Sequence, residues 1–219
     1  MAYTTIHLVR HGQVDNPGHV VYERMPGFHL SGRGRRMAEA TARFIASRSD
    51  MCAAAAIYSS PLELTQETAE AIIAAVNMQR RTGPLPPLHL HTDSRIIEAG
   101  NEFRGRRIGH GEGALWKNGN WRLILNLWRP SWGESYKAIA ERVSDFVYEQ
   151  VDRYPGGSVI AVTHESPIWS FRHMLEKGRP EHNMLLRRTA LASVTSLTFE
   201  AGTHRVMNIA YCDPAAGIS

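Results

Sequence analysis

The residues with the most chemistry to offer follow a short strand-like run near the N-terminus. Thr4 to Val9 is rich in β-branched and apolar residues, which predicts a strand, and Arg10, His11 and Gly12 come directly after it. An imidazole at a strand end can act as a nucleophile, while the planar guanidinium beside it can bind phosphate oxygens. The glycine allows a sharp turn close to a ligand. The three residues together predict a candidate anion site.

A second histidine occupies the same kind of position far along the chain. Ser158 to Thr163 is nearly all apolar, as is typical of a central parallel strand, and it ends at His164. Ligands collect at the carboxyl ends of parallel strands, and the helices that follow present amides that favour an anion. We therefore expect His11 and His164 to share one site. Glu98 could complete it, because an imidazole attack on phosphorus requires an acid to protonate the departing alkoxide.

Ordered motifs extend this pattern over most of the chain. They are Arg10-His11-Gly12, Ser59 to Glu63 with Gln66 to Glu70, Glu98, Gly133 to Ser135, and Val162 to His164. In these motifs the chain resembles the histidine phosphatase superfamily, the group that includes phosphoglycerate mutases and fructose-bisphosphatase-like phosphatases.

The resemblance implies a role for each catalytic candidate. It makes His11 the phosphorylated nucleophile, Arg10 and His164 the groups that clamp the phosphate, and Glu98 the proton donor. It also implies two substrate-binding residues. Asn16 is the candidate for the asparagine that the family commonly carries after the nucleophile, and Arg24 lies in what resembles the substrate loop.

One position departs from the family pattern. The second motif normally reads Ser-Ser-Pro-Leu-x-Arg-Ala, with the arginine binding the phosphoryl group, whereas this chain has Leu64-Thr65. The missing guanidinium removes charge-assisted hydrogen bonds worth about 1.5 to 3 kcal/mol each. Leu64 lies roughly 130° from the apolar stripe of its predicted helix, so we expect it outside that helix's core and facing the pocket.

Three accounts of this departure stay open. Arg104, in the basic segment from Phe103 to Arg107, could replace the missing arginine. The site could instead act on a less charged substrate in a non-phosphatase reaction, with Leu64 as an apolar wall. The chain could also be a catalytically weak binding relative. Hydrolysis of a phosphomonoester is the favoured prediction, because the nucleophile, the first arginine, the acid and the second histidine are all present.

The elements that must position these residues alternate along the chain and predict a three-layer α/β/α fold with a mostly parallel central sheet, as in phosphoglycerate mutases. The expected strands are 55–60, 88–92 and 158–163, followed by a closing hairpin of 192–199 and 205–211. The expected helices run from an N-cap at Ser31 to about Arg48, from Pro61 in a first turn, from a capping box at 131–134, and from a cap and first-turn proline at Ser166-Pro167.

Length and composition agree with one domain. The chain has 219 residues, 43% of them hydrophobic, and we expect a single domain over 1–219 with a cap-like insertion around 98–132. Four tryptophans in that insertion could form an aromatic lid, although packing of the cap on the core is the favoured interpretation; they are Trp116, Trp121, Trp128 and Trp132.

Partners and compartment follow from what the sequence lacks. The 22 arginines and 3 lysines, against 21 acidic residues, give a net charge of +4. They are spread along the chain without the interleaved aromatics of nucleic-acid-binding surfaces. Cys52 and Cys212 have no metal or redox spacing, and neither a leader nor a membrane span is recognisable. We expect a cytoplasmic protein with a small, phosphorylated substrate and without metal or cofactor; a homodimer stays open.

Overall fold

A six-stranded sheet forms the centre of the computed structural model, which describes residues 2–108, 110, 114, 133–183 and 186–219. Its strands, in the spatial order β3-β2-β4-β1-β5-β6, are β1 (Tyr3–Arg10), β2 (Ala56–Ser59), β3 (Leu90–Thr92), β4 (Ser158–Thr163), β5 (Val194–Glu200) and β6 (Arg205–Cys212). Strands β3, β2, β4 and β1 are parallel, and β5 and β6 continue the sheet as an antiparallel hairpin. The predicted, mostly parallel α/β sheet is confirmed.

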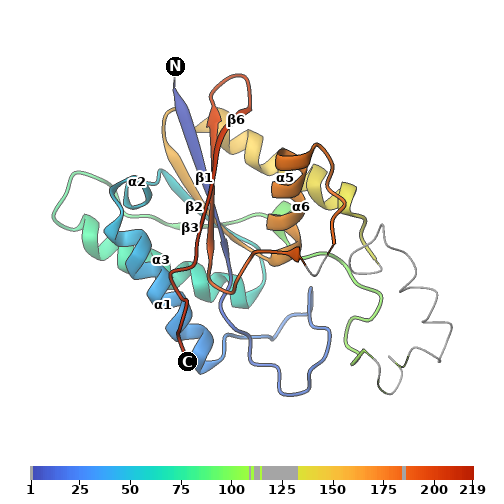
Figure 1. The fold of residues 1–219 in the computed structure, drawn as a ribbon. Helices are drawn as coiled ribbons and strands as arrows, with labels where there is room; N and C mark the ends of the chain where they lie inside the picture. The colour runs from blue at the N-terminus through green and yellow to red at the C-terminus, as the bar shows by residue number, and fades with distance from the viewer. Residues whose placement is uncertain (1, 109, 111–113, 115–132, 184–185) are drawn as a thin grey trace.

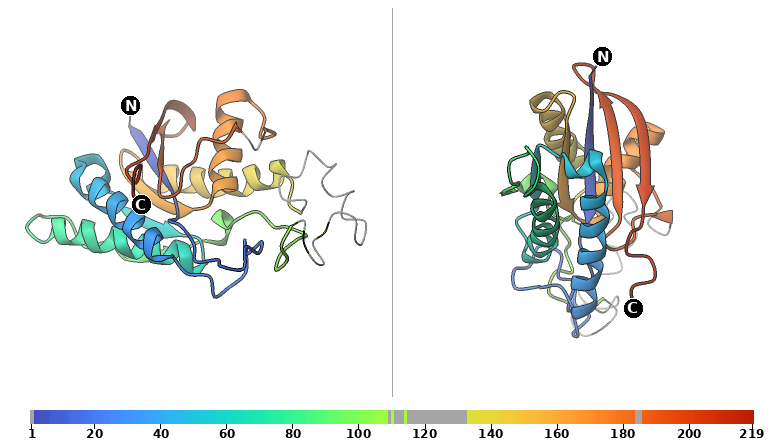
Figure 2. Two further views of the ribbon diagram at one scale, coloured as in Figure 1. Left: turned by 60° about the horizontal axis from the view of Figure 1, so that its bottom comes forward. Right: turned by 90° about the vertical axis from the view of Figure 1, so that its left-hand side faces the viewer.

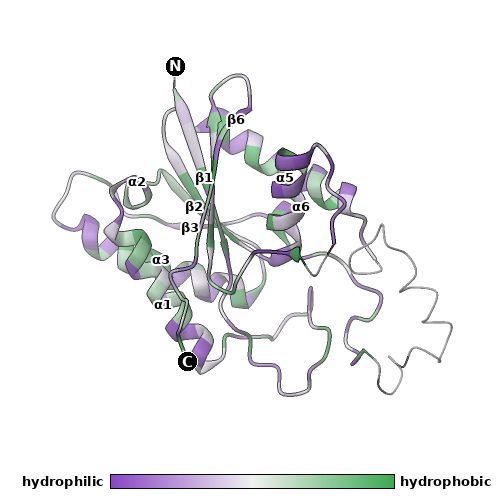
Figure 3. Cartoon of the chain, in the orientation of Figure 1, coloured by the Kyte–Doolittle hydropathy of each residue, from purple (hydrophilic) through white to green (hydrophobic). Residues whose placement is uncertain are grey.

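Helices cover both faces of this sheet. They are α1 (Gly32–Ser47), α2 (Ser49–Cys52), α3 (Glu63–Arg80), α5 (Tyr136–Arg153) and α6 (Glu165–Lys177), with a 3₁₀ turn η1 (Ser94–Ile96). Figure 1 views the sheet nearly edge-on, with α1, α2 and α3 on one side and α5 and α6 on the other, and Figure 2 shows these layers from two further directions. The helices carry both hydrophilic and hydrophobic segments in Figure 3, as expected for amphipathic helices on a sheet.

Each face of the sheet has its own apolar core. On one face Ile45 of α1 and Ile72 of α3 pack with the sheet residue Ile160, and on the other Phe146 of α5 and Phe171 of α6 pack with β1 and β4. All six residues of β4 are buried, which explains why its sequence is a nearly continuous apolar run. The three-layer arrangement thus follows from two buried sheet faces.

Several predicted boundaries hold. Helix α1 begins after Ser31, whose Oγ accepts a hydrogen bond from the Gly34 amide at 3.0 Å. The hairpin of β5 and β6 is also present as expected. Helix α3, however, begins at Glu63 with Leu62 as its N-cap, so Pro61 precedes the helix instead of occupying its first turn.

Two further predicted helix starts are wrong. Helix α5 is capped by Ser135, whose Oγ accepts from the Ala138 amide at 3.2 Å, and not by a box beginning at 131. The preceding Glu134 donates its backbone N–H to the Gly100 carbonyl at 3.2 Å, which holds this segment against another loop. Helix α6 begins at Glu165, so the expected capping residue Ser166 lies inside its first turn.

The expected insertion at 98–132 falls mostly outside the described residues, as do all four of its tryptophans. Within the described ranges, no helix combines the length and apolar character needed to cross a bilayer.

Candidate active site

The carboxyl ends of β1 and β4 bring the two predicted histidines together. Arg10 and Thr163 are register partners in the parallel ladder, and the His11 amide donates to the Thr163 carbonyl at 3.1 Å. The next residue on each strand therefore lies at the same edge of the sheet. The ring centroids of His11 and His164 are 5.1 Å apart, and the two residues are only 3% and 1% exposed.

The His11 ring is held in one tautomer. Its Nδ1 lies 2.8 Å from the Gly12 carbonyl oxygen, which can only accept, so Nδ1 carries the hydrogen and Nε2 keeps its lone pair. Burial lowers the pKa of His11 to about 3, and the neighbouring His164 and Arg10 act in the same direction. His11 is thus a neutral imidazole whose Nε2 is available as a nucleophile.

His164 is fixed by a residue of the second motif. Its Nε2 lies 2.8 Å from Ser60 Oγ, and the Ser60 amide donates to the Val162 carbonyl at 3.0 Å. Burial lowers the pKa of His164 to about 3, with further lowering by the guanidinium groups of Arg142, Arg10 and Arg24. Sequence reasoning quoted Ser60 within its motif but gave it no role.

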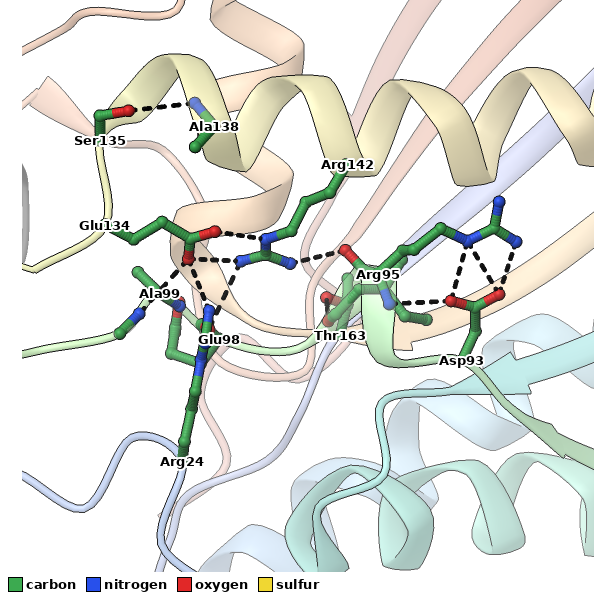
Figure 4. Close-up of polar contacts among 12 residues, drawn as sticks. Arg24, Asp93, Arg95, Glu98, Ala99, Glu134, Ser135, Ala138, Arg142 and Thr163 are labelled. Atoms are coloured by element: carbon green, nitrogen blue, oxygen red, sulfur yellow. Dashed lines mark hydrogen bonds and ion pairs between the residues drawn. The ribbon is translucent and has the colours of Figure 1, made fainter.

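Glu98 is held through its backbone by two arginines (Figure 4). Its carbonyl accepts from Arg24 Nε at 2.6 Å and from Arg142 Nη2 at 3.4 Å. Both guanidinium groups are in turn bound by Glu134, with contacts of 2.6 Å to Arg24 and 2.8 Å to Arg142. The Glu98 carboxylate accepts from the amide of Ala99 at 2.8 Å. This network fixes the segment that carries the candidate acid.

Arg24, expected to bind substrate, is bonded in this structure to the Glu98 carbonyl and to the Glu134 carboxylate. Arg142 was missed by sequence reasoning because it belongs to no motif, whereas Glu134 belongs to the motif Gly133 to Ser135 and could have been assigned.

Arg10 is bound to a carboxylate that sequence reasoning also missed. Its Nη1 lies 3.1 Å from Oε1 of Glu165, the residue directly after His164, and also donates to the Thr189 carbonyl. A cleft of about 520 Å³ lies beside Arg10, and Gln13, Asn16 and Tyr22 are among its lining residues. The cleft gives a small ligand a place next to the guanidinium.

Asn16 lines this cleft while its amide group closes a turn. Its Nδ2 donates to the Val20 carbonyl at 2.8 Å, and its Oδ1 accepts from the Val20 amide at 3.2 Å. Its side chain is thus engaged with its own loop.

Leu64 lies in an apolar core, contrary to expectation. It has no exposed surface and packs with Leu30, Ala38 and Leu62, with Phe28 at the edge of the same cluster. The expectation failed because the periodicity of α3 identifies only the face that packs on the sheet. It does not show that the loop before α1, with Phe28 and Leu30, packs on the face that carries Leu64.

Arg104 is exposed, and its backbone lies beside the loop that carries Val21. It forms a bridge with Val21, and the neighbouring Gly105 amide donates to the Val21 carbonyl at 2.8 Å. The guanidinium is therefore on the surface while the main chain supports the loop.

Comparisons with known proteins identify the family and the relatives of this chain. The family model described as histidine phosphatase superfamily (branch 1) matches residues 6–211. An uncharacterized Mycobacterium tuberculosis protein, Rv0525, is 40% identical over 214 residues, which cover 97% of this chain and 98% of that protein.

Solved structures share the fold at low identity. A mycobacterial glucosyl-3-phosphoglycerate phosphatase, Rv2419c, has a TM-score of 0.74 at 22% identity, covering 96% of this chain and 99% of its own. A phosphoglycerate mutase from Bacillus anthracis has a TM-score of 0.68 at 19% identity, covering 94% of this chain and 92% of its own.

Proposed function

Because the chain belongs to the histidine phosphatase superfamily (branch 1), we propose that it hydrolyses a small-molecule phosphomonoester through a phosphohistidine intermediate on His11. The observation that carries the proposal is the 2.8 Å hydrogen bond from His11 Nδ1 to the Gly12 carbonyl, which leaves Nε2 as the attacking atom. The neutral state of the buried ring supports the same role, since a protonated imidazole has no lone pair to offer.

The first step transfers the phosphoryl group to the enzyme. Nε2 of His11 attacks phosphorus, the ester P–O bond breaks, and Glu98 in its acid form donates a proton to the departing alkoxide. Arg10 and His164 bind the phosphoryl oxygens while the charge on them redistributes.

The second step releases phosphate. The Glu98 carboxylate accepts a proton from a water molecule, the oxygen of that water attacks phosphorus, and the P–N bond breaks. His11 returns to its neutral tautomer, because Nδ1 keeps its hydrogen at the Gly12 carbonyl throughout.

A cleft of about 520 Å³, within the usual range for small-molecule sites, lies beside Arg10, although His11, Glu98 and His164 are not among the described residues that line it. The structural relatives named above as a phosphatase and a mutase both have phosphorylated substrates in their names. Hydrolysis, as distinct from phosphoryl transfer within one molecule, is tested by the release of inorganic phosphate.

Trapping the intermediate tests the proposal directly. The protein is incubated with p-nitrophenyl phosphate, quenched in alkaline denaturant and analysed by mass spectrometry, and we expect one phosphoryl group on His11. His11→Gln should lose the label and lower turnover roughly 10³-fold or more.

The matched control is His7→Gln, the same substitution at a buried histidine within β1, whose Nδ1 lies 2.8 Å from Ser196 Oγ. It should keep the label. Phosphate release that survives His11→Gln would contradict the proposed nucleophile, and unlabelled protein with intact substrate would favour a binding relative.

A further inference from the structure

A carboxylate lies between two guanidinium groups at the entrance to α6. Glu165 Oε1 is 3.1 Å from Arg10 Nη1, and Glu165 Oε2 is 3.6 Å from Arg187 Nη1. Arg10 directly precedes the nucleophile His11 and Glu165 directly follows His164, so both ends of this ion pair are attached to the catalytic histidines. An anion-binding position therefore exists here, and a side chain of the protein occupies it.

Arg187 is oriented toward this position by a neutral histidine. Its Nε lies 2.9 Å from His182 Nε2, which must accept, since the Nδ1 of the same ring lies 2.8 Å from the Pro180 carbonyl oxygen. Burial lowers the pKa of His182 to about 4, which keeps the ring neutral and able to accept. The guanidinium is thereby fixed with Nη1 toward Glu165 and 3.4 Å from Ser166 Oγ.

The donors at this position are not all used. The Arg187 side chain is only 9% exposed, and its Nη2 makes no hydrogen bond of normal geometry among the described residues, although the Tyr136 hydroxyl lies near this guanidinium. Arg10 Nε is buried in the same unpartnered state within that part of the chain. Buried, unpaired donors on charged groups are costly, and an oxyanion with more acceptor sites than a carboxylate would satisfy them.

The arginine that the family carries in its second motif is absent from this chain, so it cannot supply a second guanidinium for the anion. Its motif position is Leu64, which has no exposed surface. Arg104, the candidate from sequence, is exposed, whereas Arg187 is nine-tenths buried and shares a carboxylate with Arg10.

We propose that Arg187 is the second phosphoryl-binding guanidinium of this site and that Glu165 holds its place until the substrate's phosphoryl group displaces the carboxylate. The inference rests on the proposed function. A phosphoryl dianion has three terminal oxygens and more charge than a carboxylate, so it can contact Arg10, Arg187 and the first amides of α6 together. The Glu165 side chain, 29% exposed, turns toward solvent when it is displaced.

Binding of inorganic phosphate, measured by isothermal titration calorimetry, tests the inference without turnover. Arg187→Ala should weaken phosphate binding about 10- to 100-fold, the effect of one lost charge-assisted contact. Arg187→Lys should recover part of the loss, because it restores the charge without the fork. The matched control, Arg43→Ala, removes an equal charge from the exposed surface of α1 and should change the dissociation constant less than twofold.

Glu165→Gln gives the outcome that a purely structural role would not produce. It removes the competing negative charge while keeping the shape of the side chain, so phosphate binding should become several-fold tighter. Unchanged binding in Arg187→Ala, or weaker binding in Glu165→Gln, would overturn the inference. If Arg187→Ala fails to fold, as judged by its thermal transition, phosphate binding by Arg187→Lys and Glu165→Gln still tests the proposed role of Arg187.

The two proposals fail separately in this experiment. A wild-type protein that binds phosphate in the expected manner but leaves His11 unlabelled would contradict the proposed function and support the role of Arg187. Hydrolysis with a labelled His11 and no effect of Arg187→Ala would support the function and exclude Arg187.

Discussion

At the scale of residues, the site depends on hydrogen bonds that decide which nitrogen of each imidazole carries a proton. The Gly12 carbonyl directs the hydrogen of His11 to Nδ1, and the Pro180 carbonyl does the same for His182. In the first case the remaining nitrogen is left for a substrate, and in the second it receives Arg187. The same kind of hydrogen bond thus fixes the tautomer of both rings, one at the candidate site and the other beside Arg187.

Leu64, which departs from the family motif, contributes to stability because its side chain is fully buried in an apolar cluster. Leu64→Ala should lower the free energy of unfolding by about 2 to 5 kcal/mol, because a fully buried leucine loses its contacts and leaves a cavity. Urea denaturation measures the loss.

The control for this change is Leu85→Ala, at a leucine that is 42% exposed, which should stay within about 0.5 kcal/mol of wild type. If Leu64 were instead a wall for the substrate, Leu64→Ala would raise KM with little change in stability, and that result would contradict its assignment to the core.

The residues that sequence reasoning found and those it missed differ in a physical way. His11 and His164 each follow an apolar strand, so the local sequence pattern predicts their position at the edge of the sheet. Arg142 and Arg187 reach the site by long side chains from segments without a motif. Local periodicity predicts which segments form strands and helices. It does not predict which of the 22 arginines forms an ion pair with a carboxylate far away in the sequence.

At the scale of elements, the end of β1 and the start of α1 meet backbone to backbone. A Cβ at Gly34 would lie 1.9 Å from the Gln13 carbonyl oxygen, and one at Gly12 would lie 2.4 Å from the Gly34 carbonyl oxygen. The Gln13 carbonyl also accepts from the Ser31 amide at 2.9 Å, at the N-cap of α1. This contact fixes the turn that follows His11.

Gly34→Ala should therefore separate the strand end from the helix. We expect the free energy of unfolding to fall by about 1 to 3 kcal/mol or more, since backbone atoms must move to admit the methyl group. Gly32→Ala is the matched control on the same helix, because its Cβ would meet its nearest atom only at 3.9 Å, and its effect should stay within about 1 kcal/mol. Equal stability of the two variants in urea would contradict the contact.

The elements themselves were predictable where one strong pattern decides them. The buried strand β4 and the capped helix α1 were predicted closely, since an apolar run and a serine cap are local signals. The starts of α5 and α6 were predicted wrongly. Glu134 is held by the Gly100 loop, so α5 begins at Tyr136, and α6 begins directly at the strand end. Both outcomes depend on tertiary contacts.

At the scale of the whole molecule, three fully buried neutral histidines, together with the partly buried His182, make the fold sensitive to acid. Burial lowers the pKa of His7 to about 4 and those of His11 and His164 to about 3, against 6.5 in the unfolded chain. Between these values the unfolded chain binds protons that the native protein does not, so the stability conferred by the neutral rings decreases as the pH falls.

We therefore expect the free energy of unfolding to decline as the pH falls from about 6.5 toward 4, by up to about 1.4 kcal/mol per pH unit for each buried histidine. Urea denaturation at several pH values measures the slope. His7→Gln should reduce it, because one titrating group is removed outside the site. A stability that does not depend on pH over this range would contradict the neutral state of the rings.

The central place of β1 has a consequence for how the protein is made. β1 pairs with β4 from Thr5 opposite Ser158 and with β5 from Tyr3 opposite Glu200, so its two neighbours follow it by more than a hundred residues. At a synthesis rate of about 5 to 20 residues per second, the first strand waits roughly 7 to 30 s on the ribosome before β4 emerges. During that interval a β-rich segment that ends just before His11 has both hydrogen-bonding edges unfilled. The yield of folded protein would then depend on keeping this strand from pairing with other chains until β4 emerges.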